Sequence, residues 1–283
     1  EFKNVDFLIG DSKKVVPKLI EKTESTIFMT TPTFCNLYAK NATKQNYQSL
    51  RYLVVGAEKL REPTRKLYAE KYKIQILEGY GCTELAPVVS CNLPHSVKTG
   101  SVGRPFPGQT IKFLDPENPS QESDDLSGLI AVNGPNVMQG YLGDMERTSS
   151  VFNDGYYITG DVGYMDDDGY LFIQDRQSRF SKIGGEMVPH LQLEELINTY
   201  LNGPNAFVCG VPDPKRGESL VVLYVDEQDK ATVPDLYSYI KDLDIPNIWK
   251  PKKSHIFKVD ELPIMMTGKV NLKAAKELAL SQL

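Results

Sequence analysis

Apolar residues in the first 80 positions follow two alternating periods. Between residues 11 and 24 they recur at the spacing of one helix face, as Val15, Val16, Leu19 and Ile20. The pattern then predicts strands at 26–30, 50–55 and 74–77, separated by helices at 33–40 and 62–72. Strands that alternate with helices predict a parallel sheet of βαβ units. We therefore expect residues 1–99 to be part of the α/β sheet of a larger domain.

The pattern changes after Glu84, where glycine, proline and asparagine interrupt short apolar stretches. These stretches lie at 100–105, 114–116 and 128–141. They predict the short strands of a small β-barrel or meander, which we expect to occupy residues 100–176.

A β-hairpin is predicted at 156–173, where two alternating stretches flank the turn sequence of residues 166–169, Asp-Asp-Asp-Gly. After Gly184 and Gly185 the pattern becomes helical. It predicts helices at 191–201, 233–243 and 273–280 and strands at 205–211, 219–225 and 254–259. We expect a domain joint that carries a binding site, followed by a separate compact α+β domain at 177–283. The predicted fold class is therefore α/β with a distinct carboxyl-terminal domain.

The composition excludes several classes of function. Of the 283 residues, 41% are hydrophobic and 24% are charged, and the net charge of −5 argues against a nucleic-acid-binding surface. Four cysteines without a CxxC pair and three scattered histidines give no metal cluster and suit a cytoplasmic protein. No apolar stretch approaches the roughly 20 residues of a membrane span, so we expect at most peripheral membrane association. The first residue is Glu1 and strand-like alternation follows at once, which indicates a part of a longer protein.

Candidate chemistry is densest at residues 79–84, Gly-Tyr-Gly-Cys-Thr-Glu, directly after a predicted strand. Glycines let the backbone approach a ligand, and Tyr80 can stack on a flat ring. The hydroxyl of Thr83 can bond a phosphate oxygen, and the carboxylate of Glu84 can hold Mg²⁺. The alternative is an ordinary strand-to-helix turn in which Glu84 caps the helix.

Three charged residues further along the chain are also candidates. Asp161 follows a glycine at a strand end and could bind the two hydroxyls of a ribose, or it could be a turn aspartate that bonds its own backbone. Arg176 could add a sugar or phosphate contact, or form a structural salt bridge. Lys269, near the carboxyl end, could neutralise a phosphate or carboxylate, although an isolated lysine is more often a solvated surface residue.

The order of these motifs resembles the AMP-forming adenylating superfamily of acyl-CoA synthetases, luciferases and peptide-synthetase adenylation domains. The resemblance covers nearly the whole chain. It rests on seven segments in a fixed order, at residues 78–84, 100–104, 128–141, 157–161, 175–176, 182–188 and 263–269.

The resemblance implies a nucleotide site for ATP or AMP with Mg²⁺. Tyr80 would stack on adenine, and Thr83 and Glu84 would face the phosphates and the metal ion, with Glu84 as the metal ligand. Asp161 and Arg176 would hold the ribose. Lys269 would bridge the carboxylate and the α-phosphate during adenylation. The remaining cofactor-binding residues would line the purine pocket, namely Gly56, Ala57, Glu58 and Gly81.

The resemblance also implies a domain movement and a substrate. The carboxyl-terminal domain would swing about Ser178, two residues after the arginine. Phe34 and the loop at 88–89 would line a pocket for a fatty acid. The segment 178–190 resembles the acyl-[acyl-carrier-protein] synthetase branch, which includes bifunctional 2-acylglycerophosphoethanolamine acyltransferases. The expected thiol acceptor is therefore acyl carrier protein; the alternatives are an acyl-CoA ligase of the same family and a non-catalytic AMP-binding or docking module.

One family motif is absent from the sequence. The loop for the β- and γ-phosphates, of the type S-G-T-T-G-x-P-K-G, does not occur and would lie upstream of Glu1. We therefore expect the chain to be the carboxyl-terminal half of the enzyme, to need the missing amino-terminal half as its partner, and to be inactive alone. Any attachment to the inner membrane would come from an upstream region.

Overall fold

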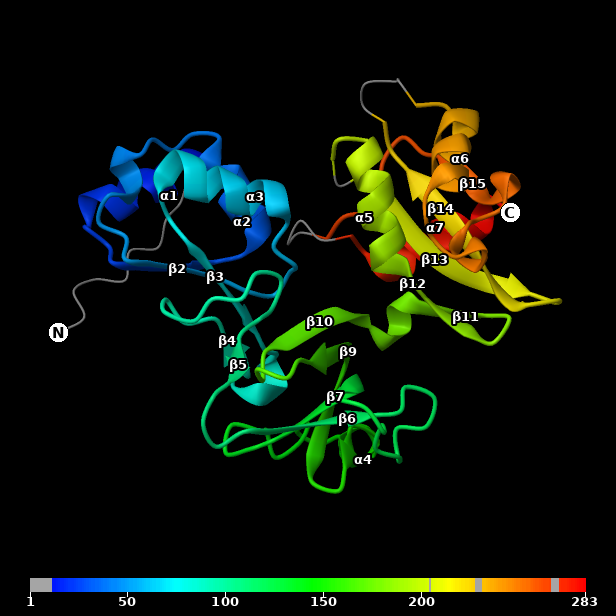
Figure 1. The fold of residues 1–283 in the computed structure, drawn as a ribbon, viewed down its shortest axis with the longest axis horizontal. Coiled ribbons are helices and arrows are strands. Elements are labelled where there is room, and N and C mark those ends of the chain that lie inside the picture. Colours follow the sequence, from blue (N-terminus) through cyan, green and yellow to red (C-terminus); the bar gives the residue numbers. More distant parts are fainter. Residues whose placement is uncertain (1–11, 204, 227–230, 266–269) are drawn as a thin grey trace. The chain divides into compact units, whose positions relative to one another are not determined.

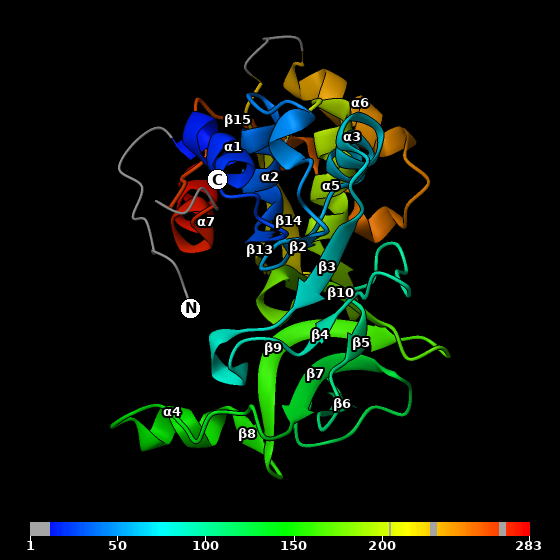
Figure 2. The ribbon, with the colours of Figure 1, turned by 90° about the vertical axis from the view of Figure 1, so that its left-hand side faces the viewer.

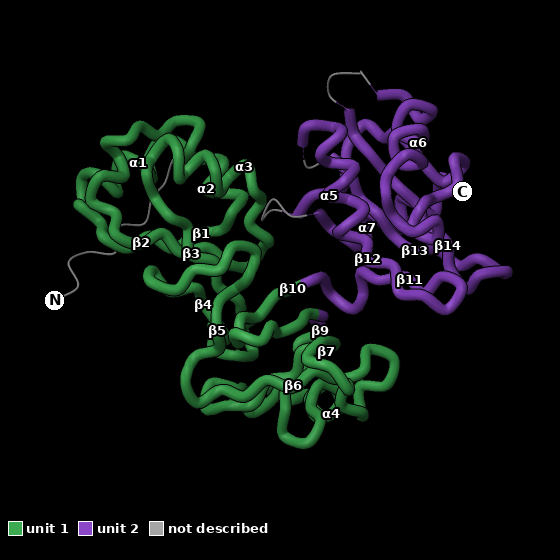
Figure 3. The backbone as a smooth tube through the Cα atoms, in the orientation of Figure 1, with its two compact units in different colours: residues 1–159, 163–173 green, residues 160–162, 174–283 purple. Residues whose placement is uncertain are grey.

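The computed structural model describes residues 12–203, 205–226, 231–265 and 270–283. The chain divides into two compact units (Figure 3). The first unit contains residues 1–159 and 163–173, and the second contains residues 160–162 and 174–283. Within the described ranges, no helix is both long enough and apolar enough to cross a membrane.

The first unit begins with a five-stranded sheet in the order β1-β2-β3-β4-β5. Its strands are β1 (Ile27–Thr30), β2 (Tyr52–Val55), β3 (Ile76–Tyr80), β4 (Ser90–Cys91) and β5 (Arg104–Pro105). The first three are parallel, and β4 and β5 are antiparallel. Its helices are α1 (Ser12–Lys22), α2 (Pro32–Ala39) and α3 (Glu62–Leu67), with a 3₁₀ turn at Gln45–Tyr47 and a π-helical turn at Tyr68–Tyr72. The predicted βαβ pattern is confirmed, although β3 begins two residues late and includes Gly79 and Tyr80.

The helices α1, α2 and α3 lie along one face of this sheet (Figures 1 and 2). Leu53 and Val55 of β2 are buried beneath them, packed with Ile20 of α1 and Cys35 of α2. Successive side chains of a strand point to opposite faces. Ile27 and Met29 of β1 therefore point to the face opposite these helices, and they are 55% and 73% exposed among the described residues. Further along the same unit, Leu93 is 56% exposed.

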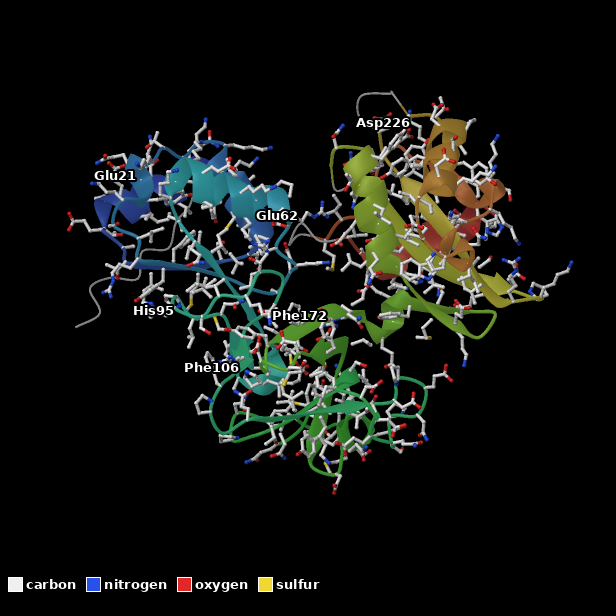
Figure 4. The ribbon with its side chains drawn as sticks, viewed as in Figure 1. Glu21, Glu62, His95, Phe106, Phe172 and Asp226 are labelled. Carbon is white, nitrogen blue, oxygen red and sulfur yellow. The ribbon has the colours of Figure 1, made fainter. Side chains whose placement is uncertain are left out.

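The second sheet has the order β10-β9-β7-β6, and β8 pairs with β9. Its strands are β6 (Thr110–Leu114), β7 (Ser127–Asn133), β8 (Phe152–Asn153), β9 (Tyr156–Met165) and β10 (Leu171–Arg176). The short helix α4 (Met145–Ser150) precedes β8. The predicted hairpin is confirmed, because β9 and β10 are neighbours. The ring of Phe172, which Figure 4 labels, stacks on that of Tyr164 with centroids 4.8 Å apart. Residues 134–141, which were expected to extend a strand, form a loop instead.

The second unit has a five-stranded sheet in the order β12-β11-β14-β13, with β15 parallel to β14. Its strands are β11 (Phe180–Ile183), β12 (Glu186–Pro189), β13 (Ala206–Asp213), β14 (Gly217–Tyr224) and β15 (Ile256–Lys258), and its helices are α5 (His190–Tyr200), α6 (Val233–Asp242) and α7 (Leu272–Ser281). One face of β13 and β14 packs on α5 and α6, and the other face packs on α7. The α/β class is confirmed, and the β11–β12 hairpin is an addition to the predicted elements.

Candidate functional site

The glycines at the ends of β2 and β3 allow the two strand ends to approach closely. A Cβ atom on Gly56 would lie 3.2 Å from the carbonyl oxygen of Gly79. A Cβ on Gly81 would lie 1.8 Å from the carbonyl oxygen of Pro87, so no other residue fits at position 81 without moving the loop. The carboxyl ends of parallel strands are where α/β sheets bind ligands.

The second loop at this sheet edge contains Ala57 and Glu58. Ala57 has a left-handed backbone with a φ of 67°, which is uncommon for a residue other than glycine. The carboxylate of Glu58 accepts hydrogen bonds from the N–H of Thr33 at 3.3 Å and from its hydroxyl at 2.5 Å. The Glu58 carboxylate thus joins this loop to the first turn of α2.

Glu84 lies in a 3₁₀ turn, Thr83–Leu85, that follows β3. Its carboxylate is half-buried and accepts a hydrogen bond from the hydroxyl of Tyr141 at 3.0 Å, while Thr83 beside it is exposed. Burial acts to raise the pKa of Glu84. Hydrogen bonds from its own N–H, from Tyr141 and from Cys82, with the charge of Arg147, outweigh burial and lower the pKa below its ordinary value. Glu84 is therefore an anion at neutral pH.

Asp161 and Arg176 form an ion pair in the second unit. The Arg176 Nε lies 3.0 Å from the Asp161 Oδ1. The Asp161 side chain is 8% exposed, whereas that of Arg176 is 61% exposed. The two residues predicted to act together are thus in contact, and the salt bridge that we considered as an alternative for Arg176 is also present.

A buried charge network that we did not predict from the sequence includes Asp175, the residue before Arg176. The Arg179 Nη2 is 2.6 Å from Glu194 Oε1, and its Nε is 3.5 Å from Asp175 Oδ1. Asp175 also accepts the N–H of Leu191 at 3.0 Å. Burial raises the pKa of Glu194 and is opposed by the charge of Arg179 and by its hydrogen bond. A glutamate among the apolar positions of the helix at 191–201 was the one sequence signal for this network.

The predicted joint contains a buried histidine. His190 Nε2 lies 2.8 Å from the hydroxyl oxygen of Ser181, and both residues are buried. Burial, with the nearby charges of Arg179 and Lys276, lowers the pKa of His190 to about 3. Ser178, the predicted hinge residue, belongs to a 3₁₀ turn at Gln177–Arg179. The loop with Lys269 lies outside the described residues.

Two family models match the chain. Residues 7–142 match the AMP-binding enzyme model, and residues 192–269 match the AMP-binding enzyme C-terminal domain. The chain belongs to the AMP-binding enzyme family. The superfamily resemblance is thereby confirmed, and the acyl-carrier-protein branch remains a prediction.

Several relatives of this AMP-binding family member carry the names of CoA ligases. A probable 4-coumarate–CoA ligase 2 of Dictyostelium discoideum is 32% identical over 92% of this chain and 48% of its own length. A long-chain-fatty-acid–CoA ligase of Bacillus subtilis is 30% identical over 89% of this chain and 45% of its own length. The structure of the o-succinylbenzoate coenzyme A synthetase of Bacillus subtilis in complex with ATP and magnesium has a TM-score of 0.81 at 26% identity, covering 94% of this chain and 54% of that one. The chain spans about half the length of the curated relatives it matches.

The described residues of this AMP-binding family member fit a nucleotide and a divalent cation. Gly56, Gly79 and Gly81 let backbone segments at the strand ends pack against one another, because a Cβ on any of the three would lie within 3.2 Å of a neighbouring carbonyl oxygen. In the part of the chain that the structure describes, no group of three or more acidic, cysteine or histidine side chains could hold a metal ion. A single anionic carboxylate such as Glu84 suits Mg²⁺, because this ion keeps several waters and takes its other ligands from phosphates.

Proposed function

We propose that the protein to which this chain belongs is an ATP-dependent acid–thiol ligase. A carboxylate oxygen of the acid would attack the α-phosphorus of ATP, and the bond to pyrophosphate would break. A thiol sulfur would then attack the acyl carbon of the adenylate, releasing AMP and a proton. Family membership and the CoA ligase names of the relatives support this reaction. The observation that carries it is the half-buried Glu84 carboxylate in the turn that follows β3, where it accepts a hydrogen bond from Tyr141.

The described residues would bind and orient the nucleotide. The ring of Tyr80 would stack on adenine, and the backbone of residues 56–58 would complete the base pocket. Asp161 would accept hydrogen bonds from the ribose hydroxyls, with Arg176 balancing its charge. Glu84 would hold Mg²⁺, and the hydroxyl of Thr83 would contact a phosphate oxygen. The bound cation supplies charge neutralisation of the phosphates.

Lys269 and Ser178 would serve the chemical step and the exchange of substrates. An ammonium at position 269 would stabilise the charge that develops between the carboxylate and the α-phosphate. A change of backbone angles at Ser178 would rotate the carboxyl-terminal unit. One face of this unit would then serve adenylation, and another face would serve the attack by the thiol.

The proposed acid is a fatty acid, and the proposed acceptor is CoA. The long-chain-fatty-acid–CoA ligase of Bacillus subtilis supports both assignments. Phe34 and Val88, each 37% exposed, are the proposed acyl contacts among the described residues. Acyl carrier protein is the second candidate acceptor, favoured by the resemblance of residues 178–190 to the carrier-protein branch.

The proposed protein needs a further half in contact with the first sheet. Parallel sheets occur almost only with both faces covered. Here α1, α2 and α3 cover one face, and Ile27 and Met29 are exposed on the other. Together with the half-length match to the relatives, this supports an amino-terminal partner half that packs on β1, and predicts little adenylation by the 283 residues alone.

Pyrophosphate exchange into ATP by the full-length protein tests the function. We expect exchange that depends on a fatty acid, is lost in Lys269→Ala and is retained in Lys241→Ala, which changes an exposed lysine of α6. Adding CoA or acyl carrier protein as the only thiol then identifies the acceptor. Folded full-length protein without exchange for any acid would overturn the ligase, and would leave a non-catalytic AMP-binding module as the function.

A further inference from the structure

The loop at residues 134–141 is bound to the turn that carries Glu84. The N–H of Met138 donates to the carbonyl oxygen of Glu84 at 2.9 Å. The side-chain amide of Asn136 donates to the carbonyl oxygen of Leu85 at 2.7 Å, and the hydroxyl of Tyr141 donates to Glu84 Oε1 at 3.0 Å. Two of these contacts fix the backbone of the turn and the third fixes the carboxylate itself, so the loop sets both where Glu84 lies and how it is oriented.

Tyr141 is itself fixed by the start of α4. Its N–H donates to the hydroxyl oxygen of Thr148 at 2.9 Å, and that hydroxyl donates to the carbonyl oxygen of Asp144 at 2.7 Å. Gly140 before it has a φ of 148°, and a Cβ there would lie 2.7 Å from the Thr148 methyl carbon. The guanidinium carbon of Arg147 lies 3.9 Å from the centroid of the Tyr141 ring. The ring is thus held from its backbone and from one face.

A buried phenol influences the same group of side chains. Tyr157 is 5% exposed, and burial, followed by its interaction with the Tyr141 side chain, raises its pKa, so the phenol stays neutral. The Glu84 carboxylate is therefore the ionised partner in its hydrogen bond with Tyr141. An ionised acceptor strengthens such a hydrogen bond and makes its geometry more specific.

We infer that Tyr141 is a positioning residue for Glu84, and that its hydroxyl, braced by Arg147 and Thr148, presents the carboxylate in one fixed orientation to the divalent cation of a nucleotide complex. This inference rests on the proposed function for the cation, and on the hydrogen bonds around Tyr141 for the positioning. A ligand held this way loses little side-chain freedom on binding, which favours affinity through preorganisation.

Tyr141→Phe tests the inference, because it removes the hydroxyl and keeps the ring under Arg147. The first measurement is the pKa of the Glu84 carboxyl group, followed by carbon-13 NMR in the 283-residue chain. Loss of a donor to the ionised form should raise this pKa. Tyr72→Phe is the control, because it removes a hydroxyl that donates to backbone carbonyls of a different core.

The second measurement is ATP binding by the full-length protein as Mg²⁺ is varied. We expect Tyr141→Phe to raise the half-saturating Mg²⁺ concentration about tenfold, to leave metal-free ATP binding unchanged, and to have no further effect in a Glu84→Gln background. An unchanged Glu84 pKa in folded Tyr141→Phe, or an equal change in Tyr72→Phe, would overturn the inference. If the wild type bound no ATP, the proposed function would fail, but the pKa measurement would still decide whether Tyr141 positions Glu84.

Discussion

The carboxylate of Asp161 is buried, whereas the guanidinium of its ion-pair partner Arg176 is mostly exposed to solvent. Exposed partners contribute little to stability, whereas a buried carboxylate that bonds a ligand contributes strongly to affinity. Changing this ion pair should therefore affect the affinity for a ligand more than the stability of the fold.

Replacing Asp161 by asparagine should weaken AMP binding by the full-length protein by about tenfold to a hundredfold, because hydrogen bonds to charged groups contribute about 1.5–3 kcal/mol. Calorimetric titration with AMP measures the effect. Asp167→Asn, in the exposed turn between β9 and β10, should bind AMP normally. Equal affinities for the two variants would remove the ribose role from Asp161.

The depressed pKa of His190 predicts acid sensitivity of the second unit. The unfolded histidine takes up a proton near pH 6.5, and the folded one only near pH 3, so stability is complete above pH 6.5 and falls as the pH is lowered. The loss should approach about 1.4 kcal/mol per pH unit between pH 6 and pH 4. Trp249, the single tryptophan, packs on the core of this unit and reports its unfolding by urea.

In His190→Gln, the unfolding free energy should depend less steeply on pH, because unfolding should take up as much as one proton fewer than in the wild type. The matched control is His95→Gln, because His95 is exposed and lies in the first unit. If wild type and His190→Gln lost stability in parallel, another group would be responsible for the acid sensitivity.

At the residue scale, a short motif was enough to select candidate residues, but not the side chains that contact them. The short motif at 79–84 was enough to select Thr83 and Glu84 as candidates. Tyr141 was missed because its link to Glu84 spans 57 residues and depends on how the loop at 134–141 is folded. Arg179 was missed because its partner Glu194 becomes buried only when α5 packs on β13.

At the scale of elements, the spacing of apolar residues and the residue types typical of turns predicted most helices and strands. They failed where a polar side chain points into the core. Strand β11 has Ser181 and Ile183 on its buried face. Because a polar serine occupies a buried position, the sequence does not show the alternation of apolar residues that predicts a strand. The hydrogen bond between Ser181 and His190 satisfies the buried hydroxyl. The adjacent Gly184 and Gly185, after which the sequence predicted a helix as the next element, have φ values of 60° and 93°, which are those of a tight hairpin tip.

The strand-end glycines give an element-scale prediction with an internal control. Gly81→Ala should destabilise the first unit by about 3 kcal/mol and weaken ATP binding, since its Cβ would overlap the Pro87 carbonyl oxygen. Gly56→Ala meets Gly79 only at 3.2 Å, and should cost about 1 kcal/mol or less. Scanning calorimetry of both variants measures this, and similar melting temperatures would show that the loop after β3 adapts freely.

At the scale of the whole molecule, the oxidation rate of Met29 reports whether another part of the protein covers the exposed face of β1. Met29 on β1 and Met145 on α4 are 73% and 79% exposed, so hydrogen peroxide should oxidise both at similar rates in the 283-residue chain. In the full-length protein, Met29 should become protected at least tenfold, while Met145 should not change. Peptide mass spectrometry gives both rates from one sample, and equal oxidation of Met29 in the two proteins would contradict the proposed partner half.

The division into units has a consequence for exchanging parts between relatives. The chain passes from one unit to the other between residues 159 and 160, 162 and 163, and 173 and 174. A gene fragment that starts at residue 174 would therefore include Arg176 and omit Asp161, its ion-pair partner. A chimaera joined there would take these two charges from different parents. If residues 160–162 are exchanged together with residues 174–283, Asp161 and Arg176 come from the same parent. The part to exchange is therefore made of two segments that are separate in the sequence.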